Sequence, residues 1–188
     1  MSRSPFRVLI ALLAALSLSA PVRAGELSGV KMPDQISVAA QPLVLNGMGV
    51  RKIAIIKVYV AGLYTAARTK DAAAILASRT PRAVRIELVR DVDKGRLTNG
   101  FKEGISKNGG TRVAAHQAHI NTFLSYFGDQ KKGTVIMFAD AAEAGLVVTV
   151  GSEVKGIIGD REFADLVFGI WLGANPPSGD LKKGLLGA

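Results

Sequence analysis

The feature that most constrains this chain is an apolar, β-branched run between Leu43 and Tyr64, LVLNGMGVRKIAIIKVYVAGLY. Its first part alternates apolar and small residues, and the Asn46-Gly47 dipeptide inside it predicts a turn. The part from Arg51 to Ala66 predicts one long strand. Apolar residues occupy both alternating faces of that strand, which implies burial on both sides for much of its length. We therefore expect the rest of the chain to wrap around this segment.

The other segments predict short strands and helices in an irregular order. Strands are expected over residues 35–39, 82–89, 133–139, 145–151 and 153–158, and helices over 69–78, 91–107, 111–127 and 161–172, with a short closing segment over 181–186. Helix starts are predicted at residues able to cap a first turn: Thr69, Asp91 or Asp93, and Asp160. Because strands do not alternate regularly with helices, the pattern favours an α+β fold, an antiparallel sheet with helices on one face.

Residues 1–24 have the composition of a cleavable signal peptide. Arg3 and Arg7 precede an apolar run over residues 8–20, and Val22-Arg23-Ala24 fits the motif that a signal peptidase reads. We expect cleavage after Ala24 and one mature domain over residues 25–188. The alternative is a membrane anchor, for which the run is short, since a hydrocarbon core is about 30 Å thick. The sequence has no cysteine, so packing alone must stabilise an exported form, which we expect in a bacterial periplasm.

Composition excludes some classes of partner. The formal net charge is +9, but the basic residues are dispersed and are not interleaved with aromatic residues, so we expect no nucleic-acid partner. The excess of positive charge favours anionic ligands or membrane surfaces. Alternatively, it reflects only a solvated basic surface. No second apolar run reaches the ~20 residues of a membrane-spanning helix, so we expect no stable membrane insertion after signal cleavage. No cofactor-binding motif occurs, and we expect no cofactor.

The two histidines are weak candidates for a metal site. His116 and His119 are spaced i, i+3 on a predicted helix, and no acidic residue lies within four positions of either. Two imidazoles alone make a poor site, so helix-surface or partly packed histidines are the default expectation and no metal is predicted.

Arg51 is the stronger candidate for function. An arginine at the start of a largely apolar strand can face a cavity between sheet and helices, where its planar fork suits a carboxylate or an enolate. The alternative is an ion pair with an acid such as Asp91 at the sheet edge. Lys57 and Tyr59 share the strand face of Arg51 but lie roughly 20 and 27 Å away along the strand at ~3.3 Å per residue. One small ligand cannot contact all three unless it is long or the strand curves.

The same segment resembles the hallmark of the chalcone isomerase-like family. LNGMGVRKIAIIKVYVAGLY matches that family's G-x-G-x-R turn and a following K-φ-x-φ-φ-G-φ-Y pattern, here Lys57–Tyr64. Further matches are VRDV at residues 89–92, FADLVFGIWLGANPPS at 163–178 and LKKGLLG at 181–187. The leader and the W-L-G-x-x-P segment are typical of the family's exported bacterial branch. The resemblance implies an open-faced β-sandwich, a large antiparallel sheet covered by a layer of helices, with a ligand cleft between the layers.

The resemblance also implies roles for individual residues. In the plant enzymes, which cyclise chalcones to flavanones, the arginine matched by Arg51 stabilises the phenolate and the enolate. In the fatty-acid-binding members the equivalent arginine, with a tyrosine, holds a carboxylate. The sequence departs from the enzymes in placing Tyr59 where they have a threonine, in having no tyrosine between Arg90 and Asn108, and in having Glu162-Phe163 near the specificity pair.

Three hypotheses follow. The favoured one is an exported, non-catalytic protein whose partner is a small apolar or carboxylate ligand such as a fatty acid, bound by Arg51 with Tyr59 and Tyr64. The second is an isomerase, an intramolecular lyase of the chalcone–flavanone type, with Arg51 as the electrostatic catalyst. The third is a structural or interaction domain whose cleft is filled by side chains. The sequence indicates no oligomeric state.

Overall fold

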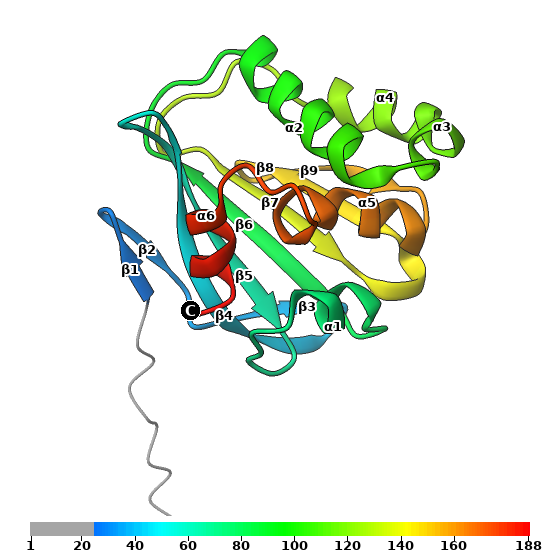
Figure 1. Cartoon of the computed structure of the whole chain (residues 1–188), viewed down its shortest axis with the longest axis horizontal. Helices are drawn as coiled ribbons and strands as arrows, with labels where there is room; N and C mark the ends of the chain where they lie inside the picture. Colours follow the sequence, from blue (N-terminus) through cyan, green and yellow to red (C-terminus); the bar gives the residue numbers. More distant parts are fainter. Residues whose placement is uncertain (1–24) are drawn as a thin grey trace, which may run out of the picture.

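A seven-stranded antiparallel sheet forms the centre of the protein in this computed structural model, which describes residues 25–188. The predicted signal peptide and its cleavage site lie in residues 1–24, outside the described residues. Each strand pairs with its neighbours in sequence, so the order is β3-β4-β5-β6-β7-β8-β9. Their bounds are Gln35–Val38, Gln41–Ile53, Ile56–Thr65, Arg82–Leu88, Val135–Asp140, Leu146–Val150 and Glu153–Ile158. Figure 1 shows the sheet curling around the helices in front of it.

The hydrophobic run at 43–64 forms a hairpin, not the predicted turn followed by a single strand. Strand β4 continues through Asn46 and Gly47 to Ile53, and the chain reverses at Ala54-Ile55 before β5 begins. The prediction was wrong because Asn46-Gly47 has a packing role instead of a turning role. The correction matters for function, because the register places Arg51 on β4 directly opposite Tyr59 on β5.

Close packing of helix α6 (Gly179–Leu185) on β4 explains the glycines of that strand. A Cβ atom at Gly47 would lie 2.3 Å from the carbonyl oxygen of Gly184, and one at Gly49 would lie 2.5 Å from that of Leu181. Only glycine allows the two backbones to approach so closely. The Asn46 amide donates to the carbonyl of Leu185 at 2.8 Å and fixes the same contact.

The helices largely follow the sequence predictions, with changes at their ends. They are α1 (Ala72–Ala77), α2 (Lys94–Gly109), α3 (Arg112–Ala115), α4 (Gln117–Ser125) and α5 (Arg161–Leu172), besides α6. The caps of α2 and α5 are Asp93 and Asp160, as predicted, whereas Asp71 and not Thr69 caps α1. The single helix expected over 111–127 is two helices, because His116 leaves helical geometry with φ −105° and ψ 18°.

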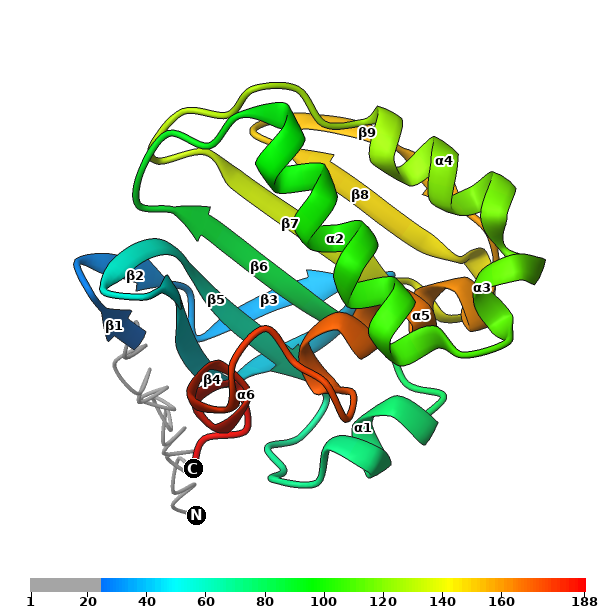
Figure 2. The same ribbon diagram turned by 45° about the horizontal axis from the view of Figure 1, so that its top comes forward.

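The helices cover one face of the sheet and enclose the larger core (Figure 2). Phe101, Phe123, Phe127, Phe138 and Trp171 meet at its centre, with ring centroids 5.0–6.3 Å apart. A smaller cluster on the opposite face packs beneath the hairpin of β1 (Gly25–Leu27) and β2 (Val30–Met32). The predicted fold class, an α+β open-faced sandwich of antiparallel sheet and helices, is confirmed. Among the described residues no helix has the length and apolarity to cross a membrane.

Candidate functional site

A cavity of about 280 Å³ opens between the β4–β5 hairpin and helix α2. The hairpin supplies one wall, the loop 90–92 and the α2 face from Arg96 to Lys107 supply another, and the segment 175–177 closes one side. The lining is mostly apolar, with Val58, Val92, Leu97, Phe101 and Ile170 inside and the exposed Ile53 and Ile56 at the rim. An apolar cleft with a few convergent polar groups is the usual form of a small-molecule site.

Arg51 lines this cavity and pairs with no acid among residues 25–188. Its Nη1 atom donates to the carbonyl oxygens of Pro177 at 2.6 Å and Lys52 at 2.9 Å. The alternative of an ion pair with Asp91 is wrong, because Asp91 pairs with Lys131 at 2.9 Å. Within the described chain, Nε and Nη2 of Arg51 make no hydrogen bond, so the guanidinium keeps both a charge and donors for a ligand.

Tyr59 brings a second donor to the same cavity. Its side chain is 9% exposed, and its hydroxyl oxygen accepts a hydrogen bond from Trp171 Nε1 at 3.1 Å. Because the oxygen already accepts from Trp171, its own hydrogen remains available to donate. Burial raises the pKa of Tyr59 to about 12, so the phenol is neutral at any physiological pH.

The hairpin brings Arg51 and Tyr59 together and separates Tyr64 from them. The ~27 Å predicted for a continuous strand is wrong, because the two residues are cross-strand partners, whose Cα atoms lie about 4.5–5.5 Å apart. Tyr64 is fully buried in the smaller cluster on the opposite face, where its hydroxyl donates to the carbonyl of Pro33 at 2.9 Å. Tyr64 does not line the cavity, because the alternation of β5 points it the other way.

Comparison with known proteins agrees with the fold that carries this cavity. The model of the chalcone isomerase-like family matches residues 24–187, nearly the whole chain. The chain belongs to this family. No curated protein sequence matches it. Among solved structures, a fatty-acid binding protein from Arabidopsis thaliana superposes with a TM-score of 0.63 at 15% identity, covering 84% of this chain and 92% of that one. At this identity the likeness shows the fold alone.

The mouth of the chalcone isomerase-like cleft carries charged side chains that are already paired. Glu103 accepts from Lys107 Nζ at 2.5 Å, and Arg96 Nε lies 3.1 Å from Asp93. The hydrogen bond from Lys107 holds the pKa of Glu103 below its usual range. A hydrogen bond from the Lys132 backbone does the same for the pKa of Asp91. Most charged side chains at the mouth are thus paired. Of the residues that line the cavity, Arg51 and Arg90 form no ion pair in the part of the chain that the structure describes, and Arg51 is the more buried of the two.

A C-terminal segment closes the cavity through contacts that the sequence did not predict. Asn108, at the end of α2, accepts from the backbone of Asn175 at 2.8 Å and donates to its carbonyl at 3.0 Å. The Asn175 amide in turn donates to the carbonyl of Lys107 at 3.1 Å. With the bond from Arg51 to Pro177, these contacts hold the 173–178 segment of the family motif over the site. Only the unusual G-A-N-P-P-S composition signals such a loop.

The histidines and the specificity-pair position lie away from the cavity. His116 Nδ1 is 3.3 Å from His119 Nδ1, while His116 Nε2 lies 3.5 Å from Glu162. The rings are stacked, and Phe163 packs against both. The structure describes no group of three or more candidate metal-ligating side chains in residues 25–188.

Proposed function

We propose that this chain is a non-catalytic binding protein for a small apolar carboxylate, such as a fatty acid. The observation that carries the proposal is the Arg51 guanidinium in an apolar cavity with no carboxylate partner among the described residues. A buried or half-buried cation is unfavourable unless an anion accompanies it. A ligand carboxylate supplies that anion, and an aliphatic tail supplies apolar surface for the remaining wall.

The ligand headgroup has two donor residues available to it, Arg51 and Tyr59. Nε and Nη2 of Arg51 form the planar fork that suits two carboxylate oxygens. The neutral Tyr59 hydroxyl supplies a third hydrogen, because Trp171 fixes the phenol oxygen as an acceptor. Since both residues stand opposite each other in the β4–β5 register, one carboxylate can contact both. Hydrogen bonds to charged groups contribute about 1.5–3 kcal/mol each.

The titratable groups of the cavity favour binding over proton transfer. General acid–base catalysis needs a group with a pKa near the working pH. Burial raises the pKa of Tyr59 to about 12, while neighbouring donors lower the pKa values of Glu103 and Asp91. None of these groups is tuned to neutral pH. An isomerase would therefore depend on the charge of Arg51 alone, and we expect no turnover of a chalcone above its spontaneous rate.

Two further facts support the ligand class. One solved structure of similar fold is that of a protein named for fatty-acid binding. The resemblance of the hairpin motif also assigns carboxylate binding to an arginine at the position of Arg51 in the family's fatty-acid-binding members.

The leader sequence further supports export to a bacterial periplasm. N-terminal sequencing of protein recovered from a periplasmic fraction tests that part, with Gly25 as the expected first residue.

Isothermal titration with octanoate tests the binding function. We expect saturable one-to-one binding by the wild-type chain and about 10- to 100-fold weaker binding by Arg51→Ala, from the loss of a charged hydrogen-bond partner. Arg96→Ala is the matched control, because Arg96 lines the same cavity but is paired with Asp93. The neutral analogue 1-octanol is expected to bind more weakly and to be indifferent to Arg51. Equal octanoate affinity in the wild type and Arg51→Ala would refute the proposal.

A further inference from the structure

The tip of the β4–β5 hairpin exposes large apolar side chains. Ile53 is 58% exposed, Ile55 92% and Ile56 47%. Three adjacent isoleucines in solvent form an apolar patch of the kind that marks an interaction site. Ile53 and Ile56 also line the rim of the cavity, so the patch is continuous with the ligand site. Figure 1 shows the tip extending beyond the body of the sheet.

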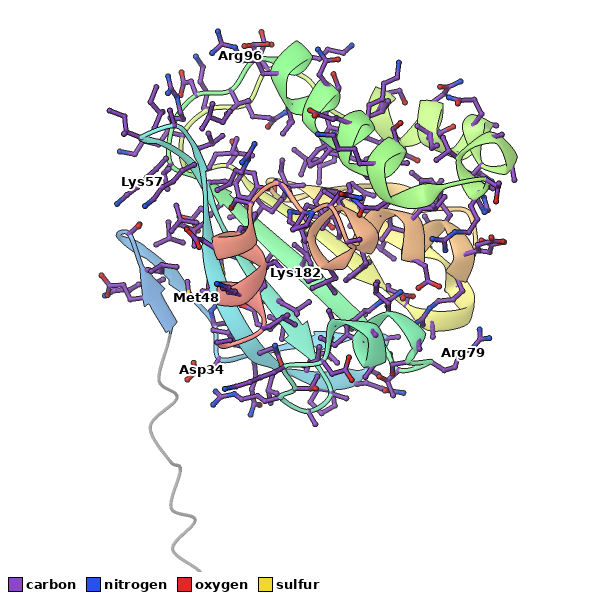
Figure 3. The ribbon with its side chains drawn as sticks, in the orientation of Figure 1. Asp34, Met48, Lys57, Arg79, Arg96 and Lys182 are labelled. Carbon is purple, nitrogen blue, oxygen red and sulfur yellow. The ribbon has the colours of Figure 1, made fainter. Side chains whose placement is uncertain are left out.

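Basic residues flank these isoleucines on both strands. The tip sequence is Arg51-Lys52-Ile53-Ala54-Ile55-Ile56-Lys57, and the whole hairpin from 41 to 65 contains no acidic residue. Lys52 and Lys57 are exposed and form no ion pair in the part of the chain that the structure describes. Figure 3 shows Lys57 on the outer side of the hairpin, away from the helices.

The tip is unfavourable for an isolated hairpin in water. Lys52 and Lys57 are direct cross-strand partners, and like charges at such positions repel each other. Ala54 turns the chain with φ 52°, a left-handed conformation that usually selects Gly or Asn. Paired lysines and solvent-exposed isoleucines at one turn are each locally unfavourable, and such unfavourable choices are typical of functional sites. An anionic surface removes both conflicts, because it screens the lysines and buries the isoleucines.

We infer that the hairpin tip docks on an anionic lipid bilayer, with Ile53, Ile55 and Ile56 inserted at the interface and Lys52 and Lys57 at the headgroups. Apolar side chains bordered by cations are the usual form of a peripheral membrane contact. Docking at this point places the mouth of the cavity at the bilayer, so a fatty acid moves between lipid and cleft without crossing water. That transfer rests on the proposed function, whereas the docking itself does not.

Site-specific fluorescence tests the docking directly. Because the chain has no cysteine, Ile55→Cys places one environment-sensitive label, such as NBD, at the tip of the full chain. The matched control is Ile157→Cys on β9, because Ile157 is 59% exposed and β9 lies four strands away from β5. With phosphatidylcholine–phosphatidylglycerol vesicles we expect a blue shift and an intensity gain at position 55 and neither at 157. High salt should weaken the response. No change at 55, or equal changes at both positions, would overturn the inference.

Vesicle co-sedimentation measures the size of the effect. We expect Ile55→Asn to weaken binding about tenfold relative to Ile157→Asn, and removal of each lysine charge to weaken it about fivefold. A tip that instead joins two copies of the chain would give an oligomer dissociated by Ile55→Asn, with no vesicle response, which would also overturn the inference. Octanoate titration without vesicles reports on the ligand site separately, so failure of either proposal is distinguishable from failure of the other.

Discussion

Two arginines at opposite ends of the helix-covered face show how differently the same side chain is used. Arg51 stands at the hairpin end and Arg82 at the start of β6, while Tyr59 pairs with Leu88 at the other end of that strand. Arg82 is 1% exposed, and each of its three side-chain nitrogens donates a hydrogen bond: Nε to Asp140 at 3.0 Å, Nη1 to the Ile75 carbonyl at 2.7 Å and Nη2 to Asp165. Its guanidinium carbon also lies 4.5 Å from the centre of the Phe168 ring. The protein satisfies Arg82 itself and leaves Arg51 for a ligand.

The largest expected effect comes from Arg82. Replacing it in Arg82→Leu leaves Asp140, which is fully buried, with the Ala142 backbone N–H at 3.0 Å and the contact to Arg161 at 3.2 Å. Breaking a buried ion pair from one side costs about 3–5 kcal/mol, and here it leaves two acids, Asp140 and Asp165, to share the single cation of Arg161. We expect a loss of that size in the free energy of unfolding, measured by urea denaturation. Asp140→Asn/Arg82→Leu is the control, since it removes both charges and should recover part of the loss. Unchanged stability in Arg82→Leu would show that the comparison is wrong.

The sequence alone predicts only part of the contrast between these two arginines. Local patterns correctly predicted most strands and the caps Asp93 and Asp160. They also selected Arg51, which lines the cavity but whose role stays a prediction. They failed at Asn46-Gly47, where turn chemistry is overridden by a helix that packs on β4 from more than 130 residues away in sequence. That single error displaced the hairpin turn and separated Arg51 from Tyr59. The partners Trp171 and Asn175 escaped prediction for the same reason, because contacts distant in sequence have no local pattern.

The next largest effect is expected from Tyr59, whose raised pKa makes the stability of the protein depend on pH above 10. An unfolded tyrosine ionises near pH 10, whereas folded Tyr59 stays protonated up to about 12. Between these values the unfolded state loses its proton first, so stability falls as pH rises from 10 to 12. The difference between a pKa of 10 in the unfolded chain and about 12 in the folded chain corresponds to about 2–3 kcal/mol. Through Tyr59, the free energy of unfolding of the wild type should fall by about that amount between pH 9 and 12. In Tyr59→Phe we expect this part of the fall to be absent.

The control for this prediction lies on the other face of the same strand. Burial also raises the pKa of Tyr64 to about 12, so Tyr64→Phe should change the alkaline stability in the same direction. Only Tyr59→Phe is expected to weaken octanoate binding, because only Tyr59 lines the cavity. Equal losses of binding in both variants would indicate that the two tyrosines are not separated by function as they are by position.

Arg51→Ala is expected to change stability far less than Arg82→Leu. Its protein partners are two carbonyl oxygens at the cavity edge, those of Pro177 and Lys52, which water can reach. Exchanging such bonds for water costs about 1 kcal/mol or less. The same urea measurement in the absence of ligand checks this expectation. A loss as large as that of Arg82→Leu would assign Arg51 a structural role and remove its distinction from Arg82.

The smallest expected effect is the gain in affinity for each carbon added to the ligand tail. This gain measures the contribution of the apolar wall separately from that of the Arg51 charge. A cavity of about 280 Å³ holds about nine water-sized groups at ~30 Å³ each, close to the size of octanoate. Each buried methylene contributes about 0.8 kcal/mol, so affinity should rise about fourfold per carbon from butanoate to octanoate and then level off. Longer tails are expected to emerge past Ile53 and Ile56, at the tip proposed to meet the bilayer. The series should keep its slope in Arg51→Ala with a uniform downward offset, because the guanidinium holds only the headgroup. A flat series in the wild type would mean that the apolar wall takes no part in recognition, and the contrast with Arg82 would then reduce to charge alone.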